Sequence, residues 1–334
     1  MDQFTAHLDR GWDLVQRGDT RGAAASARQA LEIEPQSPEA YNLLGYVAAL
    51  DGESFEAIEH YRQAVAIDET YMEAMLNAAE VYIHPLGQFD DAIAMCEQAL
   101  ALSETDEEVV DTLLLTFDAM LGKGDIDGAR SVVARLPAPP YDSPNHTFLV
   151  GRALYEMGDL AKAAPLIEEA ARKDPNHAEA WYYLALIQDE RGEAHGATES
   201  FLRARELDLQ EPEPPWAPTR DMFATAVRRA RDGLDPVYRR FVSEAEIFVS
   251  EVPGIELVAD GVDPRALVLL DGLASVETPG PPCSRIFAYQ RNVERVAGAP
   301  DRIEAVLQES LEREVSAIFL ESGSEEDGGP RHLN

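Results

Sequence analysis

Positive charge is scarce in this sequence, and lysine is nearly absent. Its 334 residues include only three lysines, Lys123, Lys162 and Lys173, and 28 basic residues stand against 62 acidic ones, a formal net charge of −34. A surface this negative repels phosphate backbones and anionic lipid headgroups. We therefore expect no binding to nucleic acid or to membrane surfaces, whereas basic proteins or peptides should be attracted.

Cysteine and long apolar runs are also lacking. Cys96 and Cys283 are too few for a disulfide framework. No run of about 18 apolar residues could span a membrane, and the first residues lack the basic and apolar segments of a secretory signal. These absences favour a reduced, cytoplasmic protein.

A short pattern recurs at intervals of 34 residues in the first two thirds of the chain. Gly18 and Gly52 are 34 apart, as are Gly124, Gly158 and Gly192. A small residue stands seven positions before the glycine in four of the copies. Alanine stands five positions after the glycine in all five copies, and twelve positions after it in four of them. These small residues are Gly11, Gly45, Gly151 and Ala185, then Ala23, Ala57, Ala129, Ala163 and Ala197, then Ala30, Ala64, Ala170 and Ala204.

Small residues at such fixed offsets let two antiparallel helices pack closely, and the glycine adopts the left-handed conformation that ends the first helix. The pattern resembles the tetratricopeptide repeat family, which implies an α-solenoid of helix pairs. The third copy is irregular at Pro85, and the fourth ends in a proline-rich run at 137–140. The six predicted repeats are about 4–37, 38–71, 72–105, 106–143, 144–177 and 178–211.

Members of this family bind partners on the concave surface formed by the first helix of each pair, as the resemblance implies here. In this register the predicted groove residues are Leu8, Trp12, Asn42, Tyr46, Glu80, Asp118, Phe148, Arg152, Tyr155, Tyr182 and Asp189. Aromatic side chains at both ends and acidic ones in the middle suit an extended or helical peptide with basic and apolar residues. The alternative is that several of the aromatic residues only pack between neighbouring repeats.

The helical repeat stops at residues 212–218, where four prolines in seven residues predict a linker. The pattern then favours a small α+β domain over 219–320 and a disordered acidic tail over 321–334. Asp301 is the predicted N-cap of the domain's last helix. The expected elements are helices 219–232 and 236–243, strands 245–252, 266–273 and 285–289, and an amphipathic helix 302–320.

This order of elements resembles a small bacterial family of zincin-like metallopeptidase domains. The segments that carry the resemblance are Phe223 with Val227, residues 234–241, and residues 285–291 leading into the last helix. In that family the last helix carries His-Glu-x-x-His, in which two histidines bind zinc and the glutamate acts as general base.

The matching positions in this sequence cannot bind zinc in that way. They hold Arg313, Glu314 and Ala317, so that only the glutamate remains. No histidine occurs between residues 196 and 331, and Cys283 is the only sulfur ligand in the domain. Because a catalytic zinc site needs about three such ligands, the sequence predicts no catalytic residue, no metal and no cofactor.

The sequence as a whole predicts a mainly helical, non-catalytic scaffold or adaptor. The repeat groove would bind one partner, and the metal-free pseudo-peptidase domain would supply a second surface, in signalling assembly or in a secretion or motility machine. Two alternatives stay open. One is a metal-dependent peptidase whose repeats recruit substrate, and the other is a regulator that sequesters the partner of an active relative.

Overall fold

The computed structural model describes residues 2–274 and 281–321 and divides into two compact units, Met1–Lys173 (unit 1) and Asp174–Asn334 (unit 2). The predicted disordered tail lies outside the described residues from position 322 onward. Within those ranges no helix combines the length and the apolar character needed to cross a membrane.

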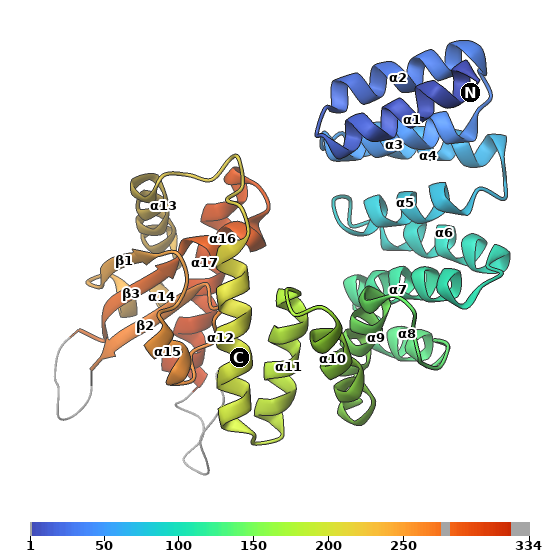
Figure 1. Cartoon of the computed structure of the whole chain (residues 1–334). Helices are drawn as coiled ribbons and strands as arrows, with labels where there is room; N and C mark the ends of the chain where they lie inside the picture. The colour runs from blue at the N-terminus through green and yellow to red at the C-terminus, as the bar shows by residue number, and fades with distance from the viewer. Residues whose placement is uncertain (1, 275–280, 322–334) are drawn as a thin grey trace. The chain divides into compact units, whose positions relative to one another are not determined.

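Over residues 2–173, the described part of unit 1, ten helices form five hairpin-like pairs that follow one another in sequence order (Figure 1). There is one pair for each of the first five predicted repeats. The pairs are α1 (Gln3–Gln16) with α2 (Thr20–Ile33), α3 (Pro38–Leu50) with α4 (Ser54–Ile67), α5 (Met72–Ile83) with α6 (Phe89–Leu102), α7 (Asp106–Lys123) with α8 (Ile126–Val133), and α9 (Pro144–Glu156) with α10 (Leu160–Lys173).

The repeat glycines adopt the predicted left-handed conformation. Their φ angles are 75° at Gly18, 81° at Gly52, 79° at Gly124 and Gly158, and 74° at Gly192. The alanines five and twelve positions further on are at most 3% exposed. Both predictions, the turn and the close approach of the paired helices, are therefore confirmed.

Unit 1 departs from the regular repeat at α8. That helix has 8 residues, whereas α2, α4, α6 and α10 have 14 each. The proline-rich segment that follows is held by a hydrogen bond from the Tyr141 hydroxyl to the Pro137 carbonyl oxygen, 2.5 Å long. The fourth repeat, which ends in the proline-rich run, thus has a shortened second helix.

Unit 2 begins with the helix pair of the sixth predicted repeat. The pair, α11 (Ala178–Glu190) and α12 (Ala194–Gln210), belongs to the same compact unit as the C-terminal sheet. The remaining elements are α13 (Arg220–Gly233), α14 (Pro236–Val242), β1 (Glu246–Ser250), α15 (Ile255–Ala259), β2 (Val268–Leu273), β3 (Cys283–Tyr289), α16 (Gln290–Ala297), a 3-10 turn (Pro300–Arg302), α17 (Ile303–Val315) and a π-helical turn (Ser316–Glu321).

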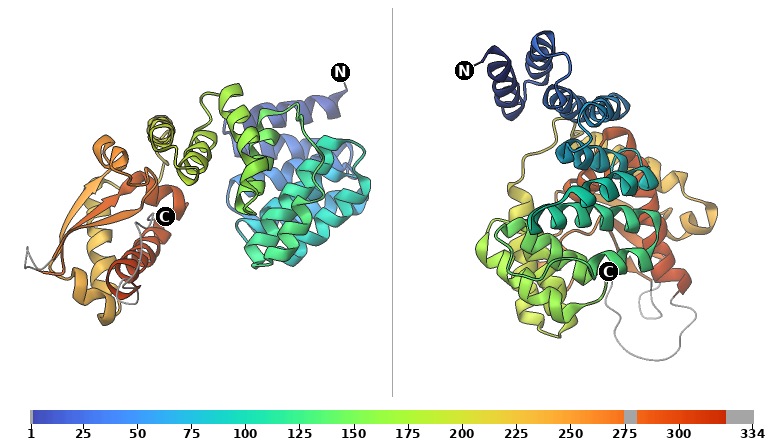
Figure 2. Two further views of the ribbon diagram at one scale, coloured as in Figure 1. Left: turned by 90° about the horizontal axis from the view of Figure 1, so that it is seen from below. Right: turned by 90° about the vertical axis from the view of Figure 1, so that its right-hand side faces the viewer.

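The described strands form one sheet in the order β1-β3-β2, with β1 parallel and β2 antiparallel to β3. Helices α13 and α17 pack side by side on it (Figure 2). Its core includes Phe223 from α13, Leu307 from α17 and Ile286 from β3. The other face carries Phe248 and Phe287, whose rings stack with centroids 5.2 Å apart.

The last predicted helix, 302–320, is wrong in two respects. Pro300 starts a 3-10 turn that contains Asp301, so Asp301 is not an N-cap. The regular α-helix ends at Val315 and continues as the π-helical turn. Helices α15 and α16, of five and eight residues, were not predicted.

Candidate protein-binding surfaces

The first helices of unit 1 present predicted groove residues at the N-terminal end. Trp12 on α1 and Tyr46 on α3 are half-buried and meet edge to face, with centroids 5.3 Å apart. Leu8, one turn before Trp12, packs against the core that the first two pairs share. These aromatic rings therefore support one another across the repeat boundary and keep part of their surface exposed.

Asn42 is not available to a partner in this structure, because its side chain is fully buried. Its amide nitrogen lies 3.1 Å from a carboxylate oxygen of Glu73, and its amide oxygen accepts a hydrogen bond of 3.0 Å from Asn77. Both partners come from α5, so Asn42 links the second pair to the third. Phe148 is likewise buried, at 3% exposure, in the packing of the fifth pair.

A hollow of about 260 Å³ lies between α5, α7 and α9 and brings together three of the predicted groove residues, Glu80, Asp118 and Arg152. An Nη of Arg152 donates to Asp118 over 2.8 Å, and its Nε lies 3.6 Å from a carboxylate oxygen of Glu156 and has no hydrogen-bond partner among the described residues. Glu80 is exposed. The other lining residues are Leu76, Asn77, Asp111, Leu114, Leu115 and Leu149.

The hollow combines an apolar floor with an acidic rim. Asp111 is engaged with His146, whose Nε2 lies 2.8 Å from its carboxylate. Glu80 has no salt bridge or side-chain hydrogen bond within the described residues. Tyr155, on the last turn of α9, is half-buried. The central part of the predicted groove thus offers leucine side chains and one uncommitted carboxylate to a ligand.

Of the two predicted groove residues of the last pair, Tyr182 is in contact with a later segment of the chain, whereas Asp189 lines a hollow. The Tyr182 hydroxyl donates to Asp263 over 2.7 Å, and the Arg265 guanidinium lies 4.3 Å from the centre of the Tyr182 ring. Asp189 lines a separate hollow of about 320 Å³ with Phe201 and residues that follow α15. At Tyr182 the surface of the sixth repeat is therefore occupied by Asp263 and Arg265 of the same chain.

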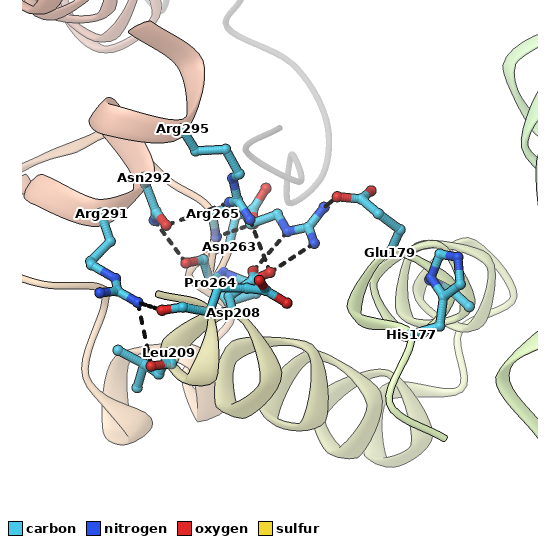
Figure 3. Close-up of polar contacts among 12 residues, drawn as sticks. His177, Glu179, Asp208, Leu209, Asp263, Pro264, Arg265, Arg291, Asn292 and Arg295 are labelled. Atoms are coloured by element: carbon cyan, nitrogen blue, oxygen red, sulfur yellow. Dashed lines mark hydrogen bonds and ion pairs between the residues drawn. The ribbon is translucent and has the colours of Figure 1, made fainter. Parts of the chain in front are cut away.

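Arg265 joins α11 and α12 to the C-terminal elements (Figure 3). It binds Asp208 through two hydrogen bonds of 2.9 and 3.1 Å and lies 2.7 Å from Glu179. Arg295 on α16 adds a third contact to Asp208, at 3.0 Å. Sequence reasoning missed this cluster, because Arg265 and Asp208 are 57 positions apart and share no motif.

Arg291, also on α16, caps the end of α12. Its guanidinium donates to the carbonyl oxygens of Leu209 and Glu211 (Figure 3). These carbonyl groups have no intrahelical donor at a helix C-terminus, and a cation there is favourable. Together with the Arg265 cluster, this contact explains why the sixth helix pair and the sheet form one unit.

The residues that were compared with a zinc-binding motif in the sequence analysis do not come together as metal ligands in the described part of the chain. Arg313 and Glu314 lie at the end of α17, and Ala317 lies in the π-helical turn. Cys283 is buried in β3, and burial raises the pKa of its thiol. Across residues 2–274 and 281–321, no three His, Cys, Asp or Glu side chains come together as a metal site would require.

The burial of Glu314 has a testable consequence. Burial raises the pKa of its carboxyl, and neighbouring Arg313 offsets this only in part. The folded protein therefore retains the proton at pH values where the unfolded chain has lost it, so stability falls as pH rises from the unfolded to the folded pKa. We expect Glu314→Gln to raise the melting temperature at pH 8 and to leave it nearly unchanged at pH 4. Equal shifts at both pH values would contradict this reasoning.

Comparison with known proteins identifies the repeats. Models of the tetratricopeptide repeat family match residues 8–71, 74–110 and 149–212. The chain is 26% identical over 198 residues to cellulose synthase 2 operon protein C of Komagataeibacter xylinus, which is 59% of this chain and 14% of that protein. It is 36% identical over 72 residues to type IV pilus assembly protein PilF of Pseudomonas aeruginosa, 22% of this chain and 29% of that protein.

The chain thus spans less than a third of the length of either of these curated relatives. A solved structure of Pseudomonas aeruginosa PilF superposes with a TM-score of 0.53 at 19% identity, covering 63% of this chain and 93% of that one. At this identity the match shows a shared fold, the array of helix pairs.

Proposed function

We propose that this tetratricopeptide repeat protein is a non-catalytic scaffold whose unit 1 groove binds a basic, amphipathic segment of a partner protein. Tetratricopeptide repeats bind proteins and peptides. The observation that carries the proposal is the hollow between α5, α7 and α9, where leucine side chains form the floor and Glu80 is free at the rim. A helix with leucine and arginine at a spacing of four residues would match both features.

The charge distribution supports a basic partner. Between residues 29 and 122 the chain has 20 acidic residues and one arginine, Arg62. Within unit 2, the chain's own Arg265 lies over Tyr182 and between two carboxylates, which is the contact that a partner's arginine would make on a repeat. Such a surface accelerates the association of basic partners and makes it salt-dependent.

Unit 2 supplies the proposed second surface. In this proposal residues 219–320 are a metal-free relative of zincin-like domains that has kept the fold and binds without catalysis. Two surfaces on one chain raise the effective concentration of one partner near another. The name of PilF refers to pilus assembly, and we propose assembly of a secretion or motility machine as the setting. The buried free thiols of Cys96 and Cys283 suit the reducing cytoplasm.

A single charge reversal in the hollow tests the proposal. We expect Glu80→Lys to weaken binding of a synthetic helical peptide with leucine and arginine at four-residue spacing by about tenfold, as measured by fluorescence anisotropy with the full chain. The same change at exposed Glu97, on the second helix α6, is the matched control and should cost little. Equal losses of affinity in both variants would mean that only the net charge of the protein matters. If the wild type does not bind the peptide, the proposed binding in the groove of unit 1 is wrong.

A further inference from the structure

Unit 2 contains a cavity of about 490 Å³ next to the arginine cluster. This volume lies in the range of cavities that hold small organic ligands. It is bounded by the start of α11, the end of α12, the segment that follows α12, and α16. The lining residues are Asn176, His177, Ala178, Glu179, Asp208, Glu211, Pro212, Pro214, Arg291, Asn292, Glu294 and Arg295.

Glu294 is the unusual member of this lining, because its carboxyl is buried without an ion pair in the part of the chain that the structure describes; burial raises its pKa, and the charge of Arg291 offsets this only in part. The residue is 2% exposed, and it accepts a 2.7 Å hydrogen bond from the side-chain amide of Gln290. Within the described part of unit 2, no basic nitrogen lies within 4.0 Å of its carboxylate. A buried charge in this state is costly unless a partner compensates it.

The two arginines nearest in sequence are engaged elsewhere. Arg291 donates to the carbonyl oxygens at the end of α12, and Arg295 binds Asp208 (Figure 3). Asn292 is also committed, because its amide donates to the carbonyl oxygens of Pro264 and Ala266 over 2.9 and 2.7 Å. These contacts fix the surroundings of Glu294 and leave its carboxyl in the cavity lining without an ion pair to either arginine.

The rest of the lining indicates what kind of cation would fit. Ala178, Pro212 and Pro214 offer apolar surface suited to a short aliphatic chain. Glu211 is exposed at the rim, and its carboxylate has no partner among the residues that the structure describes. The cavity therefore has one buried and one exposed acceptor for positive charge, with apolar wall beside them.

We propose that this cavity binds an organic cation, a primary ammonium or guanidinium group on an aliphatic chain, with the charged group at Glu294; in a diamine the second charged group lies at Glu211. The cation could be a free diamine or the basic side chain of a partner protein, since both carry the same chemistry. This site is separate from the groove of unit 1 and adds ligand binding to the scaffold function.

The test compares 1,4-diaminobutane with the neutral analogue 1,4-butanediol on the full chain at constant ionic strength. We expect the diamine, and not the diol, to raise the melting temperature of the wild type. Glu294→Gln should bind the diamine at least about tenfold more weakly by calorimetry. Glu304→Gln, an exposed site on α17, should bind it as the wild type does.

A second variant guards against indirect effects of removing the charge. Ala178→Leu narrows the cavity without changing any ionisable group, and we expect it to weaken diamine binding as well. An arginine-containing tripeptide that binds in place of the diamine would identify a partner side chain as the source of the cation. The proposal would be overturned if neither the diamine nor the tripeptide stabilised the wild type. It would also be overturned if the diamine stabilised the Glu294→Gln variant as much as the wild type.

Discussion

Replacing Asp208 with asparagine should lower the unfolding free energy of unit 2 by about 3 kcal/mol, because it breaks a buried ion pair from one side. Arg265 and Asp208 are 12% and 10% exposed in their side chains, so solvent compensates little of the loss. After the change, Glu179 is the one carboxylate within the described residues that still pairs with the Arg265 guanidinium, and Arg295 loses its contact at 3.0 Å. The buried guanidinium of Arg265 would then keep its ion pair with Glu179 and lose the one with residue 208.

Hydrogen exchange on the full chain is the suitable measurement, because it reports each unit separately. Amides of β3 should exchange faster in the variant, whereas amides of α3 in unit 1 should keep their wild-type protection. Asp232→Asn is the matched control, since Asp232 also pairs with an arginine but is 65% exposed, and an exposed pair contributes at most about 1 kcal/mol. A loss no larger than that of the control would show that the Arg265 cluster does not hold unit 2 together.

The helix pairs could be predicted from the sequence because their determinants are local. In five of the six pairs a glycine with φ of 74–81° follows the first helix, and a buried alanine stands five positions later, all within one repeat. The strands were found for the same reason, since β1, β2 and β3 all overlap the predicted segments. Local spacing reports on turns and on which face of an element is apolar.

The surfaces could be predicted only in part, because they depend on residues that are distant in sequence. The repeat register placed Glu80, Asp118 and Arg152 on first helices, and they do meet in one hollow. Asn42 also lies on a first helix at a predicted groove position, but it is buried against polar side chains of α5 about 30 positions away in sequence. No pattern in the sequence indicates in advance which neighbour will occupy a polar groove position.

The same limit explains the last repeat. Its helices match the family pattern, and Tyr182 stands where a groove residue is expected. What covers Tyr182 is Arg265 and Asp263, from a loop that follows the repeats by more than 50 residues. Periodicity identifies a helix pair, whereas its packing partner is set by a charge and shape match that one sequence does not reveal.

Gly45→Val should destabilise unit 1 by about 2–3 kcal/mol, because the contact between α3 and α4 has no room for a side chain. A Cβ atom at position 45 would lie 2.6 Å from two ring carbons of Tyr61. The ring is 1% exposed and cannot swing into solvent without leaving the core. Either α3 moves away from α4 or the ring leaves its site, and both remove buried apolar contacts.

Exchange of α3 and α4 amides would measure the loss, and a double variant tests its cause. Tyr61→Leu alone should be destabilising, because it leaves a cavity. If the clash is the cause, Gly45→Val with Tyr61→Leu should lose less than the sum of the two single changes, since leucine vacates the space that valine needs. Additive losses would mean that the cost arises elsewhere. Because α3 carries Tyr46 and packs against α5, which carries Glu80, the same displacement should also weaken peptide binding in the groove of unit 1.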